Sequence, residues 1–143
     1  MITTNALRKA MRDIAAKKGD FTLFALFKRA NGIGKWDIVV SAPWLDGSLK
    51  TSRELVDLLA KSIGRKSLPQ FARVETVLGH DPTVKFILKT FPIEDGERRI
   101  GSNDLFGLEM EDAIILRAKR PESKKPARKA PRLTAVGSAR VQR

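Results

Sequence analysis

Apolar residues in the first eighteen positions recur at the spacing of a single helical stripe. The stripe consists of Leu7, Ala10, Met11 and Ile14. Thr4 or Asn5 can cap a helix at its start, and Gly19 ends it. The other side of this segment is basic, which is typical of a solvent-facing helix surface. The pattern therefore predicts an amphipathic helix at the start of the chain.

Two apolar runs rich in Phe, Ile and Val follow, on either side of an Asn-Gly-Ile-Gly sequence at 31–34, and they predict a β-hairpin. Placing Phe27 opposite Trp36 makes one face of this hairpin entirely apolar and assigns Trp36 to the core. Asp37 then lies on the other face, near Lys28 and Lys35. We expect Asp37 to be a cross-strand charge partner rather than a catalytic base. A slip of one residue would invert both faces.

A second helix is predicted after the loop at 43–48. Thr51 and Glu54 have the spacing of a capping box, and Gly64 ends the helix. Its buried stripe consists of Leu55, Leu58, Leu59 and Ile63.

A second hairpin is predicted over residues 71–91, where apolar and polar residues alternate. The apolar face combines Val74, Thr76 and Leu78 with Val84, Phe86 and Leu88. This arrangement requires a connection of odd length, such as His80-Asp81-Pro82, and the opposite face is charged and expected to face solvent.

The segment from Ile93 to Glu111 has a weak pattern, with a turn at 94–97, a short strand at 98–100 and an irregular connection containing one helical turn. Ala113–Ala118 then reads as a final strand, whose continuous apolar run favours a covered position. Together these elements predict a single α+β domain over residues 1–118. Its sheet is antiparallel, built from two hairpins and the final strand, and two helices pack on one face.

Positive charge is concentrated at the C-terminus. The chain of 143 residues has a net charge of +12, and residues 118–143 hold nine Lys or Arg against Glu122 alone. Residues 119–143 contain few large apolar side chains, so we expect them to form a disordered basic tail. The composition of residues 119–132 resembles that of histone-linker-like tails. Such a segment suits contact with phosphates, because each contact releases counterions.

The candidate nucleic-acid-binding residues fall into two groups. The tail supplies Lys119, Arg120, Lys124, Lys125, Arg128, Lys129 and Arg132, and the open end of the first hairpin supplies Lys28, Arg29 and Lys35. Arg65 and Lys66 add further positive charge after the second helix.

The sequence contains few residues of the types that usually serve in catalysis. The chain has no cysteine and a single histidine, His80, in a predicted turn, so histidine-cluster metal sites and Cys/His dyads are excluded. The sequence at 31–36 lacks the spacing of a phosphate-binding loop. Carboxylates that could bind a hard cation in the folded part are Asp37, Glu54, Glu75 and Asp81. No catalytic residue, metal or cofactor is predicted.

These observations favour a nonenzymatic nucleic-acid-associated accessory or regulatory protein that binds phosphate backbones non-specifically, whether DNA or RNA. One alternative is a protein-interaction module, monomeric or homodimeric, with a solubilising tail; another is a small metal-dependent nuclease. The chain shows neither a secretory signal nor a membrane span, so we expect a cytoplasmic or nucleoid-associated protein with no membrane partner.

Overall fold

The computed structural model describes residues 3–30 and 34–121. Within these residues the fold is α+β, with three α-helices and a five-stranded mixed sheet of order β3-β2-β1-β5-β4. The helices are α1 (Thr4–Lys18), α2 (Leu49–Ile63) and α3 (Pro82–Thr90). The strands are β1 (Leu23–Arg29), β2 (Trp36–Ser41), β3 (Phe71–Thr76), β4 (Arg98–Arg99) and β5 (Met110–Ala118), and two short 3-10 helices are η1 (Leu68–Gln70) and η2 (Leu105–Gly107).

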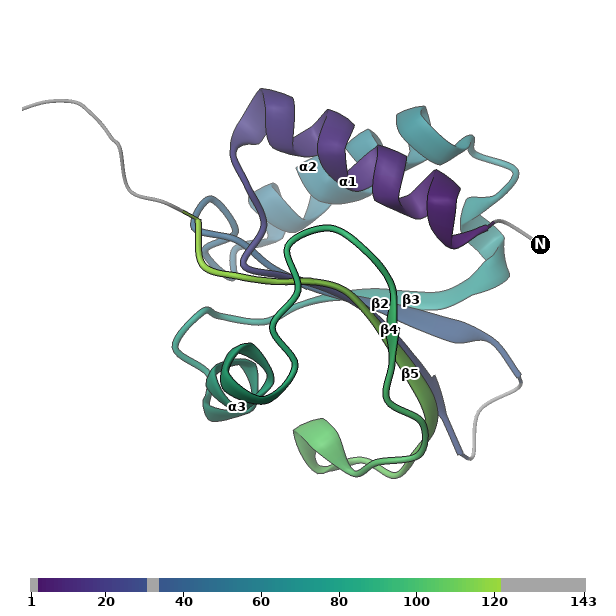
Figure 1. The fold of residues 1–143 in the computed structure, drawn as a ribbon. Helices are drawn as coiled ribbons and strands as arrows, with labels where there is room; N and C mark the ends of the chain where they lie inside the picture. Colours follow the sequence, from purple (N-terminus) through teal and green to yellow (C-terminus); the bar gives the residue numbers. More distant parts are fainter. Residues whose placement is uncertain (1–2, 31–33, 122–143) are drawn as a thin grey trace, which may run out of the picture.

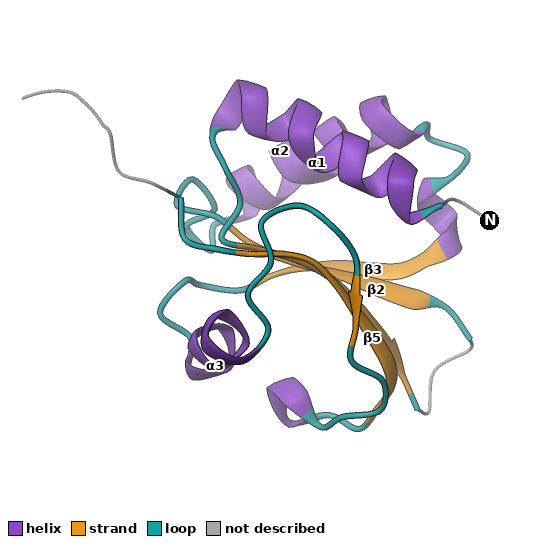
Figure 2. Cartoon of the chain, viewed as in Figure 1, coloured by secondary structure: helices purple, strands orange, loops and turns teal. Residues whose placement is uncertain are grey.

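Helices cover both faces of the sheet. Figure 1 shows α1 and α2 side by side on one face, and α3 on the other. Figure 2 shows the same three layers, with the sheet in orange between purple helices. The prediction of two helices on one face is therefore incomplete, because a third helix covers the opposite face. Within the described residues, no helix has both the length and the apolar character that crossing a bilayer requires.

Two apolar clusters result from this layering. The first lies between the sheet and α1 and α2, and it includes the predicted stripes of both helices. The second lies on the α3 side and includes Val84 and Ile87 of α3. Strand β1 contributes to both clusters, since Phe24 belongs to the first and Phe27 to the second.

The two predicted helices form, with start positions that differ from those expected. The side chain of Thr3 caps α1 by accepting a hydrogen bond from the backbone N–H of Ala6. Ser48 caps α2 in the same way through the N–H of Thr51, so the capping box predicted at Thr51 is wrong. The predicted ends at Gly19 and Gly64 are confirmed, and both glycines have a positive φ that disfavours other residues.

The first hairpin is confirmed, but its predicted register is wrong by one residue. Phe27 pairs with Asp37 instead of Trp36. Asp37 therefore shares the α3-side face with Phe27, and Trp36 is half-buried against the α1/α2 cluster. Because helices cover both faces of β1, an all-apolar face does not identify the register here.

The second predicted hairpin is wrong. After β3 the chain forms α3, and β3 itself pairs parallel with β2 through the crossover that contains α2. Asp81 caps α3 by accepting a hydrogen bond from the backbone N–H of Thr83 at 2.8 Å, and Pro82 occupies the first turn. Two of the three residues predicted to connect the hairpin strands thus form a standard helix start.

The final strand lies inside the sheet, between β1 and β4, as predicted. A β-bulge in β5 adds Leu116 between the residues that pair with Phe24 and Ala25. The buried guanidinium of Arg117, next to this bulge, donates hydrogen bonds to the carbonyls of Phe21 and Glu94. Arg117 thus ties the segment before β4 to the start of β1.

Candidate nucleic-acid interface

The basic residues predicted at the open end of the hairpin all have internal partners. Lys28 forms an ion pair with Glu111 at 3.3 Å, and Lys35 donates to the backbone carbonyl of Pro69 at 2.9 Å. Arg29 forms an ion pair with Asp37 at 3.1 Å. The structure therefore brings these three cations to one end of β1 and β2 but engages each of them within the body.

The first two tail candidates are also held by the body. The backbone N–H of Lys119 donates to the carbonyl of Thr22, and its side chain pairs with Glu94 at 3.1 Å. Arg120 donates to the carbonyl of Gly79 at 3.2 Å, just before α3. The other predicted binding residues of the tail, together with its predicted disorder, lie outside the described residues. They are Lys124, Lys125, Arg128, Lys129 and Arg132.

Asp37 is the most buried carboxylate of the candidate set, and its side chain is 3% exposed. Burial raises the pKa of Asp37 above 3.8, although Arg29 and Arg73 act in the opposite direction. Its Oδ1 atom is buried and has no hydrogen-bond partner among the described residues. The predicted role of cross-strand charge partner is seen, with Arg29 in place of Lys28 and Lys35.

The carboxylates that could bind a metal do not converge. Glu54 pairs with Lys18 at 3.0 Å, whereas Asp81 caps α3. Among the residues that the structure describes, no group of three or more His, Cys, Asp or Glu side chains is placed to hold a metal ion. His80 is exposed in the turn before α3.

Cations whose side chains have no partner among the described residues concentrate on another surface. From the sequence, only Arg65 and Lys66 of this surface are identified. Among the described cations, eight have side chains that make neither a hydrogen bond nor an ion pair nor an aromatic contact. They are Lys17, Lys50, Arg53, Lys61, Arg65, Lys66, Lys85 and Lys89, and all are exposed. We call the first six of these the α2 basic face, because they lie on α2, directly after it, or beside it on α1.

The spacing of these cations follows from the helix geometry. Lys50, Arg53 and Lys61 recur on the side of α2 opposite the buried Leu55 and Leu59. A helix of 15 residues is about 22 Å long. Arg65 and Lys66 then continue the positive charge beyond its end. Periodicity in the sequence could have identified this side of the helix, but it could not show which cations lack partners.

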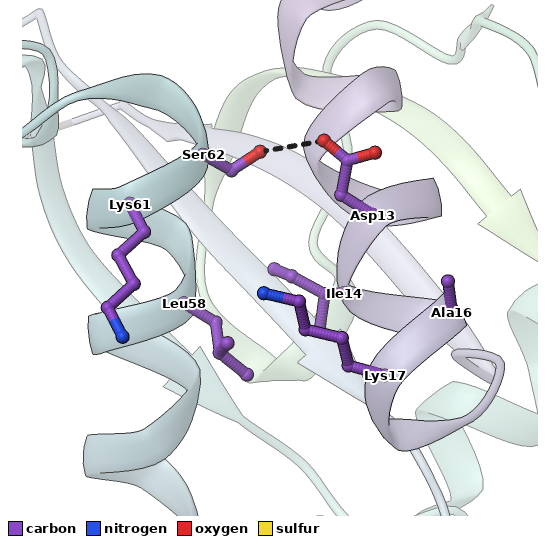
Figure 3. Close-up of a pocket in the computed structure, with 7 residues that line it drawn as sticks. All are labelled: Asp13, Ile14, Ala16, Lys17, Leu58, Lys61 and Ser62. Carbon is purple, nitrogen blue, oxygen red and sulfur yellow. Dashed lines mark hydrogen bonds between the residues drawn. The ribbon is translucent and has the colours of Figure 1, made fainter.

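A groove with a volume of about 390 Å³ separates α1 from α2 on this surface. Lys17 and Lys61 line it from opposite helices, and Figure 3 shows the Lys17 side chain directed across the groove toward α2. Asp13 also lines it and accepts hydrogen bonds from Lys9 and Ser62, at 2.8 and 3.4 Å. The hydrogen bond from Lys9 holds the pKa of Asp13 below 3.8. With Asp13 engaged in this way, the two lysines remain available to an anionic group.

No family model, curated protein or solved structure matches the chain. Its function is therefore inferred from the chemistry of its own residues.

Proposed function

We propose that this protein is a nonenzymatic accessory protein that binds the phosphate backbone of nucleic acid without sequence preference. The observation that carries the proposal is the charge of residues 122–143, which hold seven Lys or Arg against Glu122. Contacts between such a segment and phosphates release condensed counterions, so affinity arises from charge alone. The same residues contain no aromatic side chain that could stack on a base.

The α2 basic face supports this proposal by adding a folded phosphate-binding surface. Its six cations are exposed, and α2 contains two acids, Glu54, which pairs with Lys18 at 3.0 Å, and Asp57. Long flexible side chains on a convex helix surface suit phosphate oxygens, which position a protein on nucleic acid but carry no sequence information. We therefore expect the tail and the α2 basic face to contribute together.

The experiment compares the full chain with a chain ending at Pro121. This end point retains Lys119 and Arg120, because both contact the body. Binding to fluorescent duplex DNA and RNA of unrelated sequences is measured by anisotropy over a range of salt concentrations. The full chain should bind all of them. The logarithm of its binding constant should fall linearly with the logarithm of the salt concentration, and truncation should make this slope shallower by up to about 6, at roughly 0.9 for each phosphate that the tail neutralises.

Absence of binding by the full chain at low salt would overturn the proposal. Undiminished binding by the truncated chain would overturn the role of the tail and assign the site to the folded body.

A further inference from the structure

An exposed aromatic side chain stands on the outer side of α3. Phe86 is 49% exposed, and its ring contacts Phe91 edge to face, with centroids 6.2 Å apart. The guanidinium of Arg98 lies 5.5 Å from the centroid of the Phe91 ring. We call these three side chains the Phe86 platform.

The surroundings of the platform are positively charged. Lys85 and Lys89 are exposed on the same side of α3 as Phe86, and neither has a side-chain partner within the described residues. The helix Pro82–Thr90 contains no acidic residue.

The acids of the segment after α3 are engaged by other elements. Asp95 accepts hydrogen bonds from Arg8 and Arg12 of α1, at 2.9 and 3.0 Å. Glu94 pairs with Lys119, and Glu97 accepts from Thr4. Their carboxylates therefore engage groups of α1 and the end of β5 rather than Lys85 and Lys89.

We propose that the Phe86 platform stacks on an unpaired base of single-stranded nucleic acid, while Lys85 and Lys89 contact the adjacent phosphates. Aromatic rings beside cations are the usual means by which proteins hold single strands, since every base has a face on which a ring can stack. Bases within a duplex are already stacked on one another and do not offer that face. The flanking lysines favour a polyanion over an apolar protein surface as the occupant.

Phe86 of the platform lies on the helix that follows a turn contacted by Arg120. Arg120 donates to the carbonyl of Gly79, three residues before α3 begins, so this basic residue lies beside the turn that leads into the helix. Figure 1 shows α3 on the same side of the molecule as the end of β5. This inference rests on the proposed function and deepens it, because it adds a preference for single strands.

The test uses the full chain with Phe86→Ala, Phe86→Trp and the matched control Leu108→Ala, which removes an aliphatic side chain that is 44% exposed. The probes are oligo(dT), oligo(U) and a duplex of the same length. Phe86→Ala should weaken binding to both single strands by roughly five- to a hundredfold, the range measured when a stacking ring is removed. Binding to the duplex should change less than twofold, and Leu108→Ala should alter neither.

Phe86→Trp should restore single-strand binding and add a fluorescence signal that oligo(dT) quenches more strongly than in the wild type. Far-ultraviolet circular dichroism confirms that each variant retains its helices. Equal effects of Phe86→Ala on single strands and duplex, or no effect on either, would overturn the platform and leave the proposed function standing. Loss of self-association in Phe86→Ala with unchanged nucleic-acid binding would also overturn it. Absence of any binding by the wild type would defeat the proposed function itself.

Discussion

Arg29 on β1 holds the buried carboxylate of Asp37 on β2, with Nε and Oδ2 3.1 Å apart. The Asp37 side chain is 3% exposed and that of Arg29 24%, so Arg29 is the ion-pair partner of a carboxylate that water scarcely reaches. The pairing of Phe27 with Asp37 in the hairpin places Arg29, two residues after Phe27, on the same face as the carboxylate. The ion pair is therefore a consequence of the hairpin register.

Removing the cation should cost far more than removing the acid. Arg29→Ala leaves the buried carboxylate without its ion-pair partner, and we expect the free energy of unfolding at pH 7 to fall by about 3 kcal/mol. Asp37→Asn removes the buried charge itself, and it should change that free energy by less than about 1 kcal/mol. Urea denaturation of the two variants measures the difference. Equal losses in both would show that the pair acts through packing rather than charge.

The raised pKa of Asp37 leads to a second prediction, about how the free energy of unfolding depends on pH. Burial raises the pKa of Asp37 in the folded protein above 3.8, so the folded state binds this proton more tightly than the unfolded state. The resulting stabilisation is complete below pH 3.8, and it is lost as pH rises through the folded pKa. The free energy of unfolding of the wild type, minus that of Asp37→Asn, should therefore decrease as pH rises from about 3.5 and then become constant.

Subtracting the free energy of unfolding of Asp37→Asn from that of the wild type cancels the pH dependence that other acids contribute to both proteins. Asp95 is the clearest of these: burial opposes its charge, but hydrogen bonds from Arg8 and Arg12 outweigh burial and keep its pKa below 3.8. Its stabilisation is therefore lost as pH falls, the opposite direction to that of Asp37. An increase of the wild-type minus Asp37→Asn difference with rising pH would mean that Arg29 outweighs burial.

Asp81 provides a test of the helix that stands in place of the second predicted hairpin. Its carboxylate accepts a hydrogen bond from the N–H of Thr83 at the start of α3. Asp81→Ala should lower the free energy of unfolding by about 1 kcal/mol, whereas Asp81→Asn retains the cap and should cost only a few tenths. Thermal denaturation followed by circular dichroism measures both. If the two variants lose the same amount, the charge of Asp81 matters more than its capping geometry.

The error at this helix has a physical cause that the sequence contains. Val84, Ile87, Leu88 and Phe91 recur at three- and four-residue steps, which indicates a helix. The segment is also rich in β-branched and aromatic residues, which favour strands, and this composition leads to the wrong prediction. The preceding Asp81-Pro82 is the decisive signal, because an N-cap followed by proline marks a helix start.

The sequence predicts the helices better than it predicts the strand register and the ion pairs. The apolar stripes of α1 and α2 are predictable because each helix has only one buried side. Strand β1 is buried on both faces, so alternation leaves its register open, and the position of Asp37 depends on that register. The pairing of Lys28 with Glu111 joins positions far apart in the chain, so no local pattern shows which cations remain free.

The difference between free and paired cations is itself testable. One variant of the full chain replaces Lys50, Arg53 and Lys61 of the α2 basic face by alanine. The slope of the logarithm of its duplex-binding constant against the logarithm of the salt concentration should become shallower by about 2.7, at roughly 0.9 for each neutralised phosphate. The matched control replaces Lys28, Arg99 and Lys119 and removes the same formal charge. These three cations pair with Glu111, Asp112 and Glu94.

The control should lower the slope by less than about 1, because a cation that already neutralises a carboxylate is less available to a phosphate. Anisotropy titrations at several salt concentrations give both slopes from the same duplex. Equal slopes for the two triple variants would mean that net charge alone, rather than the surface of α2, determines binding. A larger decrease in the control would place the folded binding surface at the hairpin and the end of β5.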